Sequence, residues 1–127
     1  MSKGDRWGSL SPGAATVGVV LAVTRYVVPE DEAPAFLEQA DDALAAMVTR
    51  PGCTGGRVGR AIDDPTLWTL TTSWESVGAY RRALSSHDVK LRAVPLMYRC
   101  VDEPTAFEDL VTWDPAAGAA RYASDAG

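Results

Sequence analysis

The stretch from Leu67 to His87 most constrains the fold, because its residue pattern changes period partway along. Up to Trp74 it alternates, and one parity holds four large or β-branched side chains: Trp68, Leu70, Thr72 and Trp74. A period of two in such residues predicts a strand with one buried face. From Ser76, a preferred helix N-cap residue, apolar side chains recur at helical spacing. We expect a strand that passes directly into an amphipathic helix ending near His87, the only histidine.

A second strand is predicted over residues 16–28, with a different character. Its sequence, TVGVVLAVTRYVV, is apolar on both parities, which is typical of a strand covered on both faces. Thr24, Arg25 and Tyr26 add polar groups near its end. One apolar surface of this strand should therefore face helices, and the other should face something else.

A helix is predicted directly after this strand. Pro29 and the acidic residues 30–32 are typical of a helix start, with Asp31 as the expected cap. About four turns follow, with one apolar stripe along them: Phe36, Leu37, Ala40, Leu44, Met47 and Val48.

The remaining elements complete an alternating order. Residues 54–62 predict a glycine-rich strand, and Asp63-Asp64-Pro65 a turn before the central strand. A short helical piece is expected over residues 88–94, and a last strand over residues 96–102. This order predicts an α+β, ferredoxin-like βαββαβ fold: a four-stranded antiparallel sheet with its helices on one face. A second copy of the sheet would cover the other face, which predicts a homodimer.

The predicted domain occupies residues 16–102. Residues 1–15 are expected to be a mobile leader, and residues 103–127 a C-terminal extension with a disordered end. The extension carries four apolar side chains that are candidates to reach across a dimer: Phe107, Leu110, Val111 and Trp113.

The charge and the cysteine content indicate which kinds of partner and which cellular compartment to expect. A net charge of −5 and a pI near 4.7 argue against nucleic acid and against an anionic membrane surface. The apolar run 14–23 is too short to span a bilayer. Cys53 and Cys100 have no metal-type spacing and are expected to be reduced thiols of a cytoplasmic protein.

Five short motifs within residues 17–101 carry a family resemblance. They are Arg50-Pro51-Gly52 with the glycine-rich strand, Asp63-Asp64-Pro65, Trp74-Glu75-Ser76, Ala79-Tyr80 and Ser85-Ser86-His87. With them the chain resembles the antibiotic biosynthesis monooxygenase family, whose fold is a dimeric α+β barrel. Its members include cofactor-independent oxygenases of aromatic polyketides, quinol oxygenases, haem-degrading enzymes, and proteins with no established reaction.

The resemblance implies a reaction and a place for it. In the polyketide and quinol members, a phenolic substrate is deprotonated in a pocket between sheet and helices. It then passes an electron to dioxygen without metal or flavin. The haem-degrading members carry a histidine where this chain has Ala93 and an asparagine where it has Thr24 or Arg25, so haem is not expected. We expect a monooxygenase of an aromatic polyketide or quinol-type molecule, with no cofactor and no metal. The alternative is a non-catalytic dimeric barrel that binds a small molecule or acts as an accessory protein.

Six residues are candidates for the site. Histidine exchanges protons near neutral pH, which makes His87 the candidate base, with Tyr80 beside it on the same predicted helical face. The candidate substrate-binding residues are Trp74, Trp68, Thr24 and Tyr26. The alternatives are a helix C-terminal histidine that is stabilised by the helix dipole or exposed to water, and aromatic side chains that only pack in the core.

Overall fold

A computed structural model describes residues 19–121 of the chain. The predicted leader and the last residues of the extension lie outside this range. The main domain runs in the order β1 (Val20–Val27), a 3-10 turn η2 (Glu30–Glu32), α2 (Ala33–Val48), β2 (Cys53–Arg60), β3 (Leu67–Trp74), α3 (Val77–Ser85), α4 (His87–Arg92), α5 (Val94–Met97) and β4 (Ala106–Glu108). A hairpin, β5 (Val111–Asp114) and β6 (Gly118–Arg121), follows. No helix within these residues is long and apolar enough to cross a membrane.

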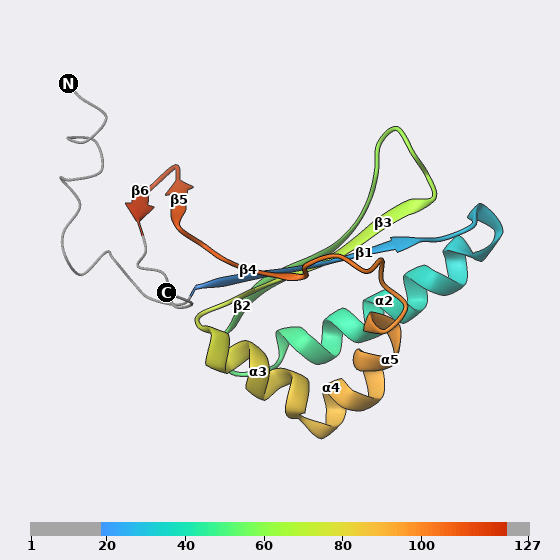
Figure 1. Cartoon of the computed structure of the whole chain (residues 1–127), viewed down its shortest axis with the longest axis horizontal. Coiled ribbons are helices and arrows are strands. Elements are labelled where there is room, and N and C mark those ends of the chain that lie inside the picture. Colours follow the sequence, from blue (N-terminus) through green and yellow to red (C-terminus); the bar gives the residue numbers. More distant parts are fainter. Residues whose placement is uncertain (1–18, 122–127) are drawn as a thin grey trace.

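The sheet has the predicted α+β, ferredoxin-like topology. Its strands are antiparallel in the order β2-β3-β1-β4, and all the helices lie on one face of it (Figure 1). β1 and β3 are the two central strands, paired from Val20 opposite Trp74 to Val27 opposite Leu67. The alternation of β3 is confirmed, because the parity that begins at Trp68 is buried against the helices.

The predicted last strand, residues 96–102, is wrong. Its first two residues belong to α5, and the fourth strand of the sheet is β4, which pairs with Val20–Ala22 of β1. Pro95 does not prevent the helix, because proline is tolerated in a first helical turn, where its missing N–H would have no intrahelical partner. Val89, Ala93 and Leu96 follow one another at helical spacing, and all three are buried. The fourth strand therefore lies in the segment 103–127.

Helix α2 packs on the sheet through small side chains. Ala40, Ala43 and Ala46 have no exposed surface, so the helix backbone can approach the strands closely. The predicted stripe is confirmed at Phe36, Ala40 and Met47 and is wrong at Leu37 and Val48, which are exposed. The buried face of α2 is therefore centred on the alanines and not on the predicted stripe, and the small alanine side chains allow the close approach.

The start of this helix also differs from the prediction. Asp31 lies in the 3-10 turn η2 and does not cap α2, for which Glu32 is the N-cap residue without a side-chain hydrogen bond. Ser76, by contrast, caps α3 as predicted, because its hydroxyl accepts a 3.0 Å hydrogen bond from the Ala79 N–H.

The structure explains why the Arg50-Pro51-Gly52 motif ends in glycine. The φ of Gly52 is +89°, and a Cβ there would lie 2.5 Å from the Cβ of Ala79. Its carbonyl accepts a 2.7 Å hydrogen bond from the Glu75 N–H. The turn between α2 and β2 thus touches the junction of β3 and α3, and only glycine fits this approach.

The face of the sheet opposite the helices is open, and it combines apolar side chains of β1 and β4 with polar side chains of β2 and β3. Because directly paired residues point to the same side of a sheet, Leu21 and Phe107 share this face, which alternation extends to Val23 and Val27. Val27 is 70% exposed and Phe107 42%. The β5–β6 hairpin stands away from the helices and exposes 65% of Trp113 (Figure 1).

Candidate functional site

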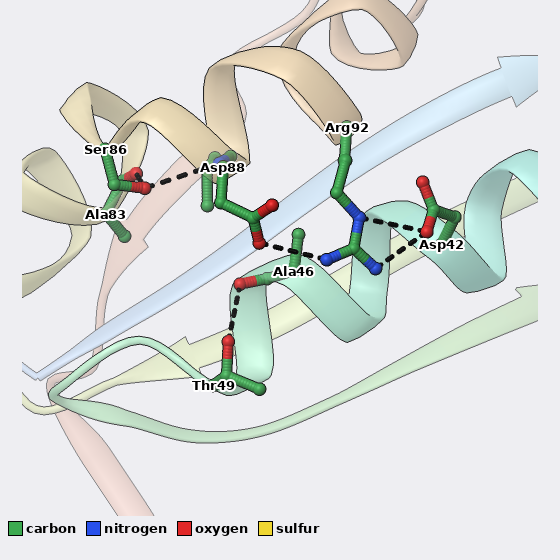
Figure 2. A network of polar contacts seen from close by, with 8 residues as sticks. Asp42, Ala46, Thr49, Ala83, Ser86, Asp88 and Arg92 are labelled. Atoms are coloured by element: carbon green, nitrogen blue, oxygen red, sulfur yellow. Dashed lines mark hydrogen bonds and ion pairs between the residues drawn. The ribbon is translucent and has the colours of Figure 1, made fainter.

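A single serine separates α3 from α4. The Ser86 hydroxyl donates a 2.8 Å hydrogen bond to the Ala83 carbonyl and accepts one of 3.4 Å from the Val89 N–H (Figure 2). Ser86 thereby caps both the C-terminal end of α3 and the N-terminal end of α4. His87 is consequently the exposed first residue of α4. The prediction that it ends the same helix as Tyr80 is wrong, and so is the alternative of a helix C-terminal histidine.

Helix α4 is joined to α2 by ion pairs. Arg92 donates hydrogen bonds to Asp88, at 2.9 Å, and to Asp42 of α2, at 2.7 Å (Figure 2). The hydrogen bond from Arg92 lowers the pKa of the Asp42 carboxyl, and the same bond raises the pKa of Arg92. These exposed pairs join α4 to α2, while Val89 and Ala93 of the same segment lie in the core and Lys90 lies at the wall of a cavity.

This cavity, of about 370 Å³, lies between β1 and the helices. The volume falls within the range of small-molecule sites. The lining is partly apolar and partly made of hydroxyl, thiol and amino groups: Thr24, Leu84, Lys90, Val94, Met97, Tyr98, Cys100 and Thr105. The cavity can therefore take a largely apolar molecule and offer hydrogen bonds to its oxygen atoms.

Thr24 connects the cavity to a buried pair of hydroxyls. Its hydroxyl shares a 2.8 Å hydrogen bond with that of Tyr26 and also donates to the Leu70 carbonyl at 3.3 Å. Burial raises the pKa of Tyr26 to about 12, the hydrogen bond with Thr24 opposes this, and Cys100 and Tyr80 add to it. Burial also raises the pKa of Tyr80. Both phenols therefore stay protonated at neutral pH.

Replacing Tyr26 by phenylalanine is expected to reduce the amount by which the free energy of unfolding falls at high pH. The unfolded chain releases this proton near the ordinary pKa of 10.0, while the folded protein keeps it until about 12. The folded state then binds more protons, so the free energy of unfolding falls as pH rises above 10, by roughly 1 kcal/mol at pH 11. Urea unfolding at pH 9 and 11 measures this difference for wild type and Tyr26→Phe.

The matched control is Tyr98→Phe, since Tyr98 is 85% exposed. Tyr98→Phe should keep the wild-type dependence on pH. Tyr26→Phe should retain only the part that comes from other groups whose pKa burial raises, Tyr80 and Cys53. An equal dependence in wild type and Tyr26→Phe would contradict the raised pKa.

The other predicted aromatic residues lie in the core. Trp74 has no exposed surface, packs against Tyr80 with ring centroids 5.6 Å apart, and donates a 2.8 Å hydrogen bond to the Thr72 hydroxyl. Trp68 packs edge-on against Phe36 at 5.4 Å. Of the six predicted site residues, the described lining of the cavity includes Thr24 alone, and Tyr26 reaches it through Thr24.

Sequence reasoning missed most of the lining. Met97, Tyr98 and Cys100 fall in the segment expected to be a strand, and Thr105 falls in the expected extension. For Lys90 a signal existed, because the predicted helical piece 88–94 places it one turn from His87 and from Val94. Within residues 19–121, no three His, Cys, Asp or Glu side chains gather in a way that could hold a metal ion.

Comparison with known proteins identifies similar chains. Residues 19–91 match the model of a family described as antibiotic biosynthesis monooxygenase. No curated protein matches the chain.

Three solved structures illustrate the likeness in fold. A conserved protein from Methanosarcina mazei Go1 is 18% identical with a TM-score of 0.60, over 72% of this chain and 92% of its own. A Mycobacterium tuberculosis protein is 15% identical with a TM-score of 0.63, over 76% and 100%. A conserved protein of unknown function from Bacteroides thetaiotaomicron, described as a possible oxidoreductase, is 11% identical with a TM-score of 0.63, over 72% and 98%. At these identities the likeness concerns the fold.

Proposed function

Because the chain belongs to the antibiotic biosynthesis monooxygenase family, we propose that it is a cofactor-independent monooxygenase of an aromatic polyketide or quinol-type molecule. The observation that carries the proposal is the cavity between β1 and the helices, with apolar walls and hydroxyl groups along its lining. A fused or substituted ring would lie against Leu84, Val94 and Met97. Its oxygen atoms would receive hydrogen bonds from the lining hydroxyls, such as that of Thr24.

The chemistry proposed is oxidation of the bound molecule by dioxygen. With anthrone as the substrate, one O₂ converts the CH₂ group to a carbonyl, which gives anthraquinone and one water. Loss of a proton makes the ring electron-rich enough to reduce oxygen, so the protein's task is to bind, desolvate and deprotonate it. His87 is the proposed base. His87 is exposed and lies three residues before the lining residue Lys90 on α4. Side chains at this spacing are neighbours on a helix, which supports the proposal that His87 acts from the outer side of the cavity.

Oxygen uptake tests the proposal directly. With anthrone, the wild-type protein should consume one O₂ per anthraquinone formed, faster than protein-free buffer at the same pH, and a quinol is tested in parallel for oxygen uptake above the buffer rate. His87→Ala should lower kcat/KM by on the order of 100-fold, because a positioned general base contributes at least that factor. Product formation is followed by absorbance in parallel with an oxygen electrode.

Arg81→Gln is the matched control, because Arg81 is exposed on α3 and lies outside the described lining of the cavity. It should retain wild-type turnover. Oxygen uptake no faster than in buffer, for wild type and variants alike, would contradict the oxygenase proposal. Full activity of His87→Ala would remove His87 as the base.

A second candidate function is a non-catalytic barrel that binds a small molecule. The exposed position of His87 favours it, and so does the absence of histidine and carboxylate side chains from the described lining of the cavity. Saturable binding of anthraquinone-like ligands without oxygen uptake would identify this function.

We also propose that the protein is a cytoplasmic homodimer. The apolar side chains on the open face of the sheet support the dimer, because a second sheet would remove Val27 and Phe107 from water. Cys53 and Cys100 are both free, as expected of proteins in a reducing compartment.

A further inference from the structure

Lys90 is the one charged side chain in the described lining of the cavity. Two other cations near α4 and β1 are ion-paired: Arg92 with Asp42 and Asp88, and Arg25 with Glu103 at 3.2 Å. Arg99, which follows α5, donates a hydrogen bond to the side-chain carbonyl of Gln39 and lies outside the described lining of the cavity. Lys90 makes no ion pair with any residue from 19 to 121. Its neighbours one turn away along α4 and α5 are Ser86, His87, Ala93 and Val94, and none of them is acidic. The cavity thus has an uncompensated positive charge at its wall.

We propose that Lys90 makes this cavity selective for apolar molecules that carry one anionic group, a carboxylate or an ionised phenol. The ammonium pairs with the anion at the rim, while the apolar part lies against Leu84, Val94 and Met97. The proposal rests on the proposed function for the identity of the site, and it names the class of substrate.

The negative charge of the whole chain increases the contribution that Lys90 makes to anion binding. The net charge is −5, so the field of the protein as a whole disfavours an approaching anion. A lysine beside low-dielectric walls reverses that sign at one place. The position also suits the chemistry, because His87 lies one turn away on the same face of α4. The ammonium of Lys90 would stabilise the phenolate that forms when the proposed base takes the proton of a bound phenol.

Two fluorescent probes with one ring system separate charge from apolar fit. 1-Anilinonaphthalene-8-sulfonate carries an anionic group, and N-phenyl-1-naphthylamine lacks it. Lys90→Gln should weaken binding of the sulfonate about 3- to 5-fold, the size expected of an ion pair at a partly exposed site, and leave the neutral probe within 1.5-fold. Lys90→Arg keeps the charge and should keep most of the affinity. Arg81→Gln removes the same charge elsewhere and should change neither probe.

Alkylation of the two cysteines locates the probes. Cys100 lines the cavity and Cys53 does not, so a bound probe should slow the reaction of Cys100 with iodoacetamide and leave that of Cys53 unchanged. In Lys90→Gln, a sulfonate concentration that half-protects the wild type should protect Cys100 less, while the neutral probe protects it equally.

Three results would overturn the proposal: equal weakening of both probes by Lys90→Gln, equal weakening of the sulfonate by Lys90→Gln and Arg81→Gln, or no slowing of Cys100 by the sulfonate. The assay uses no turnover, so its outcome is separate from that of the oxygen-uptake test. A protein without oxygenase activity can still show the charge selectivity, and an active oxygenase can lack it.

Discussion

Replacing Trp74 by alanine is expected to lower the free energy of unfolding by about 3–5 kcal/mol, the range for truncating a buried aromatic side chain. Trp74 has no exposed surface and fills the space between β3 and α3, where it packs against Tyr80. Its loss leaves a cavity in the core and a buried Thr72 hydroxyl without its donor. Chemical denaturation, followed by circular dichroism, measures the effect.

Two variants separate the parts of this effect. Trp74→Phe keeps most of the volume and should cost less than the alanine variant. Thr72→Val removes the hydrogen-bond acceptor without opening a large space, and reports the polar contribution alone. If Trp74 were a pocket wall, Trp74→Ala would instead retain wild-type stability and change the affinity for an aromatic ligand. That result would contradict the position of Trp74 in the core.

The central strand and the helix start were predictable because their signals are local. In β3 a strict alternation and burial on one face agree, so the side chains facing the helices follow from the sequence. Ser76 caps α3 through a hydrogen bond from the Ala79 N–H, only three residues further along the chain. The identity of Gly52 also has a reason, but that reason is its approach to Ala79, a contact across 27 positions that no local pattern contains.

The prediction of the last strand, over residues 96–102, was wrong for two physical reasons. The helical piece was expected to end at residue 94, but Pro95 lies in the first turn of α5, where proline is tolerated, and the chain stays helical. The true strand β4 has only three residues and too little alternation to recognise, since its conformation depends on pairing with the edge of β1. Contacts distant in sequence decided this element.

The misplaced strand also explains why most of the cavity lining was not predicted. Met97, Tyr98 and Cys100 line the cavity only because the chain is helical and then turns before β4. With residues 96–102 interpreted as a strand, the aromatic residues of β3 were the remaining candidates for a pocket wall. A tryptophan on the helix-covered face of a central strand packs in the core, and Trp74 does so. The site prediction retained Thr24, whose position on β1 did not depend on the last strand.

Replacing Val23 by aspartate is expected to convert the proposed homodimer into a monomer. Val23 lies on β1, a central strand, and its paired residue is Thr71 of β3 on the open face of the sheet. A second sheet packed on that face would take the new carboxylate out of water, which costs several kcal/mol per ion. Light scattering with size-exclusion chromatography should show the mass fall from that of a dimer to the 13.5 kDa of one chain.

The matched control places the same charge on the opposite side of the molecule. Leu37 is 48% exposed on α2, beyond the helix-covered face of the sheet, so Leu37→Asp should remain a dimer. Val23 is only half-buried in the single chain, so circular dichroism of Val23→Asp should match the wild type and exclude unfolding as the cause. A wild-type mass of 13.5 kDa at micromolar concentration, or an unchanged mass for Val23→Asp, would contradict pairing through this face. The apolar side chains of that face would then be covered by something other than a second sheet.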